Sequence, residues 1–420
     1  MNSKLNRLPI WLALTTALCT PSIVAAQSGE EPSPNVTVQE RSRPDYDPIG
    51  IHAGSYFIYP SLTVEGAYDS NVFATKRDEK DDFFATIAPR IAAQSDFSRH
   101  QLNFTVGAEG AAYDQYDSNN YLDFFTDANG RLDITRDDTL SGALGVSRLH
   151  EDRSSPDSTG RGEDVTKYWQ DVLRLNYRHN FNRFYGLIGG DITRFDFEDN
   201  GDINEDDRDR NQYRGRLRLG YNISERFSGF FEGAYDVRRY DNTPNDAGVD
   251  RNSQGYALRA GTEIDITGIL FGELAAGYTH RTYDDDSLNS VGGLGGSGKL
   301  TWNVTPLTSI IFEARGEVQE TTVVVDGDPA TADFEKAVSI DVTHELLRNV
   351  LLNANAAFIR DDFEGTDRTD NTFQAGAGVT YLINRHLSLD ATYRFSTRDS
   401  ESTDADYSRS LVRLGITARL

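Results

Sequence analysis

Apolar and polar side chains alternate along most of the chain from Tyr56 to the C-terminus. In the segment 213–221, Tyr, Leu and Gly occupy one set of alternate positions, and Arg214, Arg216 and Arg218 occupy the other. Alternate residues of a β-strand point to opposite faces, so this pattern predicts strands with one apolar and one polar face. Such strands form soluble sandwiches, whose apolar face is a core, and membrane barrels, whose apolar face meets lipid.

The lengths of the connections between the strands favour the second of these folds. Short turns are expected at 96–99, 136–138, 180–183, 222–226, 267–269, 305–308, 346–349 and 384–386. Longer polar connections are expected at 69–82, 114–120, 151–166, 196–210, 241–252, 284–292, 321–333, 361–370 and 398–407. Outer-membrane barrels alternate tight periplasmic turns with longer external loops. We therefore predict an all-β, transmembrane, antiparallel up-and-down barrel of about 18 strands, or 16, with short periplasmic turns and longer acidic external loops.

Aromatic residues recur where the strands approach the long connections. They are Tyr68, Tyr113, Trp169, Tyr235, Tyr256, Tyr278, Phe373 and Tyr393. The chain has 20 Tyr and 22 Phe although only 38% of its residues are hydrophobic. An aromatic girdle at the membrane interface accounts for both observations.

The N-terminus divides the chain into three predicted parts. Lys4 and Arg7, an apolar stretch and the small residues before Gln27 predict a signal peptide over 1–26, cleaved after Ala26. Residues 27–54 are polar and rich in proline, which predicts a flexible periplasmic lead-in. Residues 55–420 form the predicted barrel. We therefore expect the mature protein in the outer membrane of a Gram-negative bacterium.

Composition excludes several classes of function. The net charge of -24 excludes nucleic acid as a partner, because phosphate binding requires a basic surface. No apolar run after the N-terminus is long enough for a membrane helix. The only cysteine, Cys19, lies in the predicted signal peptide, so thiol chemistry is not expected in the mature chain. The seven histidines are scattered without a nucleophile pattern, so no enzymatic activity and no essential cofactor are expected.

Charged residues recur at positions expected to face the lumen. The candidates are Arg174, Arg178, Arg214, Arg216, Arg218, Arg259, Arg315, Arg394, Glu263 and Glu313. In one interpretation they pair across neighbouring strands and fill a polar interior. In the other they create a transverse field that orients polar or anionic solutes in transit.

One long connection resembles a calcium-binding loop. Its candidate ligands are Asp196, Glu198, Asn200, Asp202 and Asp207, with Gly201 at the place where an EF-hand turns sharply. Glu198 and Asp207 depart from the usual residue types, and strands rather than helices flank the segment. A Ca²⁺ site is one interpretation, and a solvated acidic loop is the other.

Two segments resemble a known family. Arg413, Gly415, Ala418 and Leu420 resemble the C-terminal signal of chains that the barrel-assembly machinery inserts. The segment 65–73, followed by Asp81, Asp82 and the sequence Ala-Pro-Arg at 88–90, resembles the opening hairpin of the putative β-barrel porin 2 family. The resemblance implies a role in secretion of exopolysaccharide or capsule, with a glycan and a periplasmic polysaccharide-export protein as partners, beside outer-membrane lipid and lipopolysaccharide.

Two functions follow for a barrel of this size. The first is a conduit in export of exopolysaccharide or capsular polysaccharide, which rests on the resemblance. The alternative is a general or substrate-selective diffusion porin, because the same fold and lumen would serve it.

Overall fold

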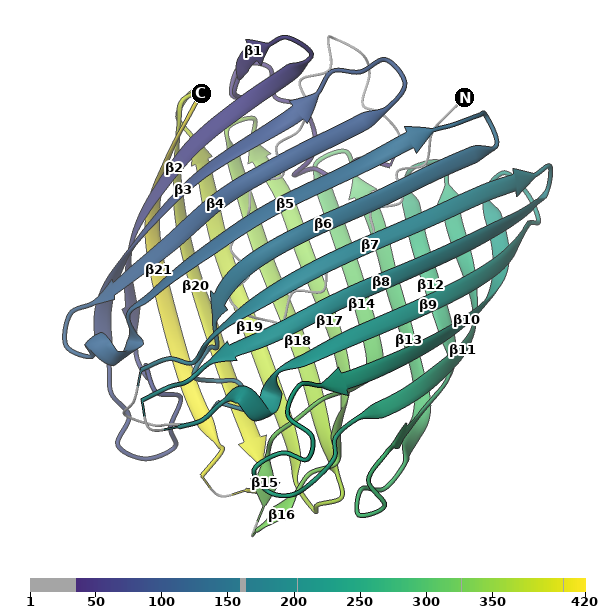
Figure 1. Ribbon diagram of the computed structural model, residues 1–420. Helices are drawn as coiled ribbons and strands as arrows, with labels where there is room; N and C mark the ends of the chain where they lie inside the picture. Colours follow the sequence, from purple (N-terminus) through teal and green to yellow (C-terminus); the bar gives the residue numbers. More distant parts are fainter. Residues whose placement is uncertain (1–34, 159–163, 202, 326, 403) are drawn as a thin grey trace.

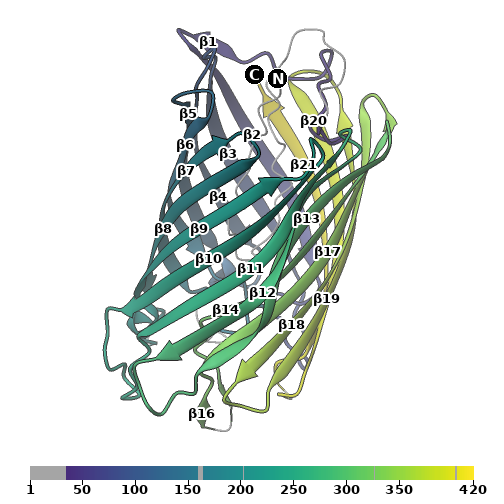
Figure 2. The same ribbon diagram turned by 90° about the vertical axis from the view of Figure 1, so that its right-hand side faces the viewer.

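A computed structural model describes residues 35–158, 164–201, 203–325, 327–402 and 404–420. Its main sheet has 19 strands, of which the three-residue β1 (Ile51–Ala53) is a short addition to β2. The other strands form a closed antiparallel barrel of 18 strands, as the sequence predicts (Figures 1 and 2). Among the described residues, no helix is long and apolar enough to span a membrane.

The wall strands follow one another around the barrel in sequence order, and the last pairs with the first. They are β2 (Tyr56–Asp69), β3 (Asp82–Ser95), β4 (Gln101–Tyr113), β5 (Tyr121–Asp133), β6 (Asp138–His150), β7 (Lys167–Phe181), β8 (Phe184–Glu198), β9 (Arg210–Asn222), β10 (Phe227–Tyr240), β11 (Ser253–Ile266), β12 (Leu270–Tyr283), β13 (Val291–Thr305), β14 (Thr308–Gln319), β17 (Ala332–Leu347), β18 (Val350–Glu364), β19 (Thr369–Leu382), β20 (Leu387–Ser400) and β21 (Tyr407–Arg419). The loops also hold two 3-10 turns, η1 (Asp117–Asn119) and η2 (Asp206–Arg208), and a small hairpin of β15 (Val324–Val325) and β16 (Asp328–Pro329).

One of the predicted long connections is shorter than the sequence indicates. The prediction places a polar loop over 361–370, but β18 continues to Glu364 and β19 begins at Thr369, so only 365–368 connect them. In this stretch Asp361 pairs with Asp370 in the sheet. The guanidinium of Arg368 binds the carboxylate of Asp370, with 2.6 Å between Nη2 and Oδ2. Polar residues continue the strands here because cations offset their charges: Arg368 binds Asp370, and Lys336 and Arg360 bind Asp362. Polarity alone therefore does not mark the loop.

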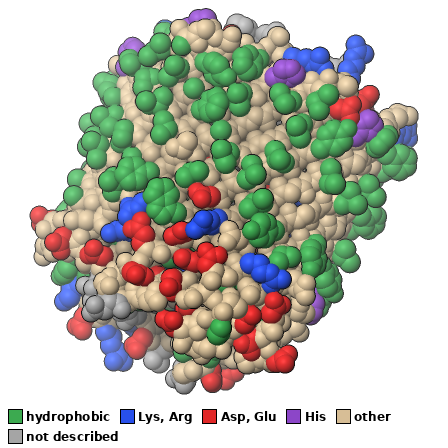
Figure 3. Space-filling view, in the orientation of Figure 1, with side chains coloured by type: hydrophobic (Ala, Val, Ile, Leu, Met, Phe, Trp, Pro, Cys, Tyr) green, Lys and Arg blue, Asp and Glu red, His purple; other side chains and the backbone are tan. Residues whose placement is uncertain are grey.

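The outer face of the wall is apolar over the span between its two rims. Figure 3 shows hydrophobic side chains spread over the upper and middle wall, and acidic side chains gathered at the end with the long loops. Seven of the eight expected girdle aromatics lie on the same face of their strands as exposed apolar neighbours. Tyr113 does not, because its ring packs inward, stacked on Phe84 at 4.5 Å between centroids. It occupies the alternate position, which faces the lumen.

The described part of the expected flexible lead-in lies against the barrel. Residues 35–50 run along the end of the barrel that carries the short turns, and Val38 donates its backbone N–H to Ser309 Oγ on β14. Arg43 forms an ion pair with Glu345 on β17. The exposed fractions of the two side chains are 3% and 4%, respectively. This segment therefore makes specific contacts from Asn35 onward, which its proline-rich composition did not indicate. The predicted signal peptide lies outside the described residues.

Candidate functional site

Basic and acidic side chains alternate across one part of the inner wall. Arg174 on β7 pairs with Asp191 on β8, which pairs with Arg214 on β9, and Arg214 in turn pairs with Asp236 on β10. All four occupy the positions opposite to the lipid-facing side chains. We call these four residues and Arg281 the charge ladder. Directly paired opposite charges stabilise a sheet, and here they also place fixed charges of both signs along one side of the lumen.

A glycine completes the ladder. Asp236 pairs across the sheet with Gly255, and Gly255 with Arg281. A Cβ at Gly255 would lie 3.1 Å from Asp236 Oδ1 and 3.2 Å from Arg281 Nη2. Because the glycine has no side chain, the Arg281 guanidinium passes over it and binds the Asp236 carboxylate.

Nearer the periplasmic end, the predicted residue Arg218 is surrounded by acidic groups. Its guanidinium lies 2.7 Å from Glu232 Oε2 and 2.7 Å from Glu273 Oε2, and 3.7 Å from Glu263 Oε1. Arg178 lies 3.8 Å from the same Glu263 oxygen. These contacts connect side chains from β7, β9, β10, β11 and β12. Side chains from strands so far apart in the wall can meet only inside the barrel. Two of the predicted arginines share Glu263, and the cluster contains three acidic and two basic side chains.

The other predicted lumen residues also lie on the inner face, at different places. Arg216 donates to Asn176 Oδ1 at 2.6 Å, and Arg259 lies opposite Glu232 in the sheet. On the far side, Arg315 forms an ion pair with Glu335, and Glu313 lies 2.6 Å from the ammonium of Lys299. Arg394 occupies an inward position of β20. The structure therefore brings Arg174, Arg178, Arg214, Arg216 and Arg218 into one region and leaves Arg315, Arg394 and Glu313 elsewhere.

The external loop 151–166, which we call the mouth loop, reaches across the end of the barrel. Its Asp152 carboxylate lies 3.1 Å from Nη1 of Arg409 on β21. Its Asp157 accepts hydrogen bonds from the Thr321 hydroxyl at 2.6 Å and the Thr322 backbone N–H at 2.8 Å. The loop begins at β6, so these contacts connect three separate parts of the barrel rim. The described residues of the mouth loop therefore narrow the external mouth.

The mouth loop is held by packing as well as by charge. Val165 is buried in a cluster of inward residues that includes Ala67, Phe84 and Tyr121. Burial raises the pKa of Asp152, but the Arg409 guanidinium and the hydrogen bonds from Ser154 together outweigh that effect and lower the pKa below its usual range. The carboxylate is therefore charged at neutral pH and attracts Arg409 in a place with little water.

A second external loop, 320–331, meets the mouth loop from the opposite side. Its Glu320 carboxylate forms an ion pair with Arg238 on β10. Burial raises the pKa of Glu320, but the nearby Arg238, Arg281 and Arg210 outweigh it and lower the pKa to about 2. Arg251 donates hydrogen bonds to the backbone carbonyls of Thr321 and Ala330. The two loops thus rest on charged side chains of the wall near the external rim.

These loop contacts were not predicted from the sequence. The length of the two loops, which is typical of functional loops, is the one feature of the sequence that indicates a role for them. Asp152, Asp157 and Glu320 look like ordinary solvated acids, because their partners are far away in the sequence. Only the closed barrel brings them together.

The proposed calcium ligands do not converge as an EF-hand would require. Asp196 pairs with Arg194, and Glu198 with Arg148. The Asn200 side chain donates to Thr166 Oγ1 and the Asp164 carbonyl. Asp202 lies outside the described residues. An EF-hand-like site needs ligands from the start and the end of the loop around one cation. Asp196 and Glu198 instead point outward from the end of β8.

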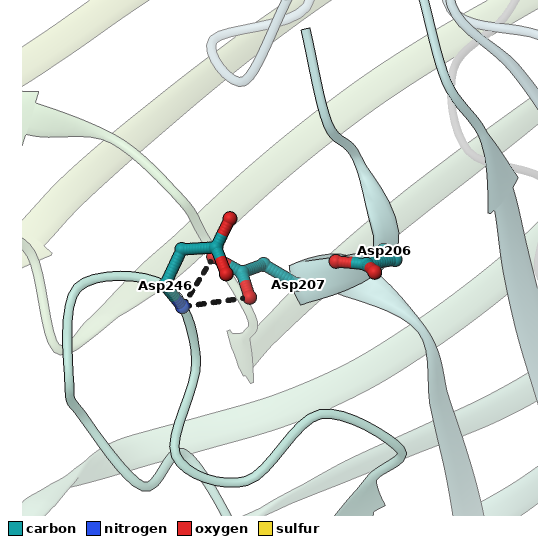
Figure 4. Close-up of side chains that lie close together, drawn as sticks. All are labelled: Asp206, Asp207 and Asp246. Atoms are coloured by element: carbon teal, nitrogen blue, oxygen red, sulfur yellow. Dashed lines mark hydrogen bonds between the residues drawn. The ribbon is translucent and has the colours of Figure 1, made fainter.

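Asp207 instead lies with two other acidic residues. Carboxylate oxygens of Asp206, Asp207 and Asp246 all lie within 4.8 Å of one another (Figure 4). Asp207 also accepts hydrogen bonds from the Asp246 backbone N–H at 3.0 and 3.1 Å. Exposed acidic groups often approach one another without a cation, so calcium binding by this loop stays a prediction from the sequence.

The predicted assembly signal lies in the strand that closes the barrel. Gly415 pairs with Glu65 of β2, and Arg413 Nη1 lies 3.5 Å from Glu65 Oε2. Ala418 and Leu420 face outward beside the lipid-facing Leu414 and Ile416. This placement is that of a terminal strand, and recognition by the assembly machinery stays a prediction.

A search of curated proteins returned no match to the chain. Among solved structures, OccAB4 of Acinetobacter baumannii is 12% identical, with a TM-score of 0.43, over 90% of this chain and 100% of that one. OpdL and OpdK of Pseudomonas aeruginosa are 11% and 8% identical, with TM-scores of 0.42 and 0.44. The alignment with OpdL covers 88% of this chain and 99% of OpdL, and the alignment with OpdK covers 86% of this chain and 99% of OpdK.

The family assignment rests on the sequence over nearly the whole barrel. The family model described as Putative beta-barrel porin 2 matches residues 43–420. The match confirms the resemblance carried by the first hairpin and the last strand, and it also includes part of the segment along the periplasmic rim. Together with the closed barrel, it identifies a porin-like channel of the outer membrane. The chain belongs to the Putative beta-barrel porin 2 family.

Proposed function

We propose that the protein is a substrate-selective diffusion channel whose charge ladder sorts solutes by charge. The observation that carries this proposal is the alternation of Arg174, Asp191, Arg214 and Asp236 on four consecutive strands. Fixed charges in a lumen with low-dielectric walls raise the local concentration of ions of opposite sign. A solute that carries both a charge and polar groups would meet partners of both signs as it crosses.

The mouth loop supports selectivity rather than free diffusion. It joins β21 through Asp152 and the loop 320–331 through Asp157, so a solute must pass beside these contacts. Rings of charged side chains at constrictions are a common source of selectivity in channels.

Solute flux tests this function directly. Purified protein would be placed in liposomes, and swelling would be followed with neutral and with anionic sugars of similar size. We expect the two rates to differ in the native protein and to approach each other when Arg174 and Arg214 are replaced by Gln. Equal rates for both sugars in the native protein would contradict the proposal.

Glycan export is a second candidate, favoured by aromatic side chains inside the external half of the barrel. Phe84 and Tyr113 stack at 4.5 Å, and Tyr168 and Phe197 at 5.0 Å. Aromatic faces can pack against sugar rings, but Phe84 and Tyr113 belong to the cluster in which Val165 of the mouth loop is buried. Export would therefore require the mouth loop to move. Deletion of the gene followed by measurement of surface polysaccharide tests it, and loss of polysaccharide is the result that favours export.

A further inference from the structure

The outer wall has an apolar groove where it faces lipid. The groove has a volume of about 730 Å³ and lies over β11 to β18. Its floor is a row of small residues that pair directly across the sheet, Ala260, Ala276, Gly296 and Gly316. Its sides include Leu274, Leu294, Val338 and Phe358. Leu294 is 83% exposed, which places this face of the strands toward lipid.

The register of the strands gives the groove a direction. Gly316 pairs with Lys336 on β17, and Lys336 pairs with Arg360 on β18, so the row of small residues ends at two cations. Ala260 and Ala276 lie near the middle of their strands, whereas Lys336 and Arg360 lie close to the external loops. The groove therefore runs obliquely from the centre of the wall to the outer leaflet.

The two cations at the external end of the groove share one carboxylate. Lys336 Nζ lies 2.8 Å from Asp362 Oδ2, and Arg360 Nε lies 2.8 Å from Asp362 Oδ1. The exposed fractions of the Lys336 and Arg360 side chains are 50% and 47%. The cluster keeps one net positive charge on the lipid side of the barrel. Such charges are unfavourable at the bilayer midplane and tolerable near the interface, where phosphate groups lie.

We propose that this groove binds the lipid A part of lipopolysaccharide. A phosphate of lipid A would contact Lys336 and Arg360, and an acyl chain would lie along Gly316, Gly296 and Ala276. The combination of a cationic end and an apolar trough fits a phosphorylated lipid of the outer leaflet better than a protein partner. The inference rests on the outer-membrane location of the barrel and is independent of what crosses its lumen.

Another lipid-facing cation provides a matched control. Arg194 on β8 is 50% exposed and pairs with Asp196 at 2.9 Å. This pair has one cation and one carboxylate, and Arg194 does not line the groove. Arg194→Gln removes one positive charge from the same outer face without touching the proposed site.

Native mass spectrometry with added purified lipid A tests the cationic end. We expect the double variant Lys336→Gln, Arg360→Gln to bind lipid A roughly tenfold more weakly, because each basic group near an anionic surface contributes several-fold in affinity. Arg194→Gln should bind as the native protein does. Lipid A without phosphates should bind the native protein as weakly as intact lipid A binds the double variant. Equal occupancy in the native protein and the double variant would overturn the proposal.

Filling the trough tests the apolar part separately. A Cβ at Gly316 would meet nothing nearer than 3.5 Å, so Gly316→Leu fills the groove without forcing the backbone to move. We expect this variant to keep heat-modifiable migration, which reports a folded barrel, and to lose most lipid A binding. Gly316→Cys gives the opposing test, because Cys19 is the only native cysteine and lies in the predicted signal peptide. Efficient disulfide crosslinking between two copies at this position would assign the groove to a second chain and overturn the proposal.

Discussion

The carboxylate of Asp152 and the guanidinium of Arg409 meet at 3.1 Å across the external mouth of the barrel. Asp152 belongs to the loop after β6 and Arg409 to the final strand, and Arg409 also binds the fully buried Asp69. A contact between a loop and a distant part of the wall fixes the loop over the lumen. The mouth loop is therefore part of the channel and does not simply extend into the solvent.

Removing the charge of Asp152 should loosen the mouth loop. In Asp152→Asn, Arg409 keeps Asp69 as a partner, so we expect a cost of roughly 1–3 kcal/mol in loop attachment. Single-channel conductance in planar bilayers should rise or become more variable, while the folded barrel remains. Asp117→Asn, at an exposed position of η1, is the control and should leave conductance as in the native protein. Identical traces from both variants would mean that the mouth loop does not limit the current.

The loop 320–331 should stay attached over the neutral and mildly acidic range. The pKa of Glu320 is lowered to about 2 by Arg238 and its neighbours, from an ordinary value of 4.5. A carboxyl with a lowered pKa in the folded state contributes stability above its ordinary pKa, and loses it as the pH falls through the folded value. Conductance should therefore change little between pH 7 and 5 on account of this group, and change progressively below about pH 4.5. In Glu320→Gln the acid-induced change should be reduced.

Asp209 has the opposite behaviour. Burial, with a smaller contribution from the nearby Asp196 and Asp241, raises its pKa to about 6, although the hydrogen bond from the Phe197 backbone N–H opposes the shift. A carboxyl with a raised pKa destabilises the folded loop when it is ionised, so stability should increase as the pH falls through 6. Limited proteolysis of the loop 199–209 should be slower at pH 5 than at pH 8. Asp209→Asn keeps an acceptor for Phe197 and should remove the difference between the two pH values.

The segment along the periplasmic rim should depend on Arg43 and Glu345. Glu345→Gln leaves the Arg43 guanidinium buried without its counter-charge, which costs about 3 kcal/mol or more. Protease added to detergent-purified protein should then cleave within 35–50 much faster. Arg348→Gln removes an exposed partner of the same carboxylate, 3.5 Å away and 59% exposed, and should cost less than about 1 kcal/mol. Similar cleavage of both variants would contradict the role assigned to the buried pair.

The fold could be predicted because its signals are local. Alternation along each strand and turn residues between strands need only neighbouring positions, and they gave the barrel and the strand count. The lumen candidates followed from the same alternation, since Arg214, Arg216 and Arg218 share a face. The connection predicted over 361–370 is shorter than the sequence indicates. Charged residues occur in strands as well as in loops when ion pairs such as Arg368–Asp370 offset their charges.

The remaining features depend on contacts between distant residues. The mouth loop is held in place by Arg409 and Thr321. These residues lie far along the chain from their partners, Asp152 and Asp157. The expected calcium loop used spacing within one segment, whereas Asp207 meets Asp246 from the next loop. The groove on the outer wall depends on the register of β12 to β14, which places Ala276, Gly296 and Gly316 side by side.

Ion selectivity in planar bilayers tests the charge ladder most directly. The reversal potential under a potassium chloride gradient would be measured for the native protein, for Arg174→Gln with Arg214→Gln, and for Asp191→Asn with Asp236→Asn. We predict a shift toward cations in the first double variant and toward anions in the second, because each removes charges of one sign from the same row. Unchanged reversal potentials in both double variants, with barrels that still fold and conduct, would contradict the account.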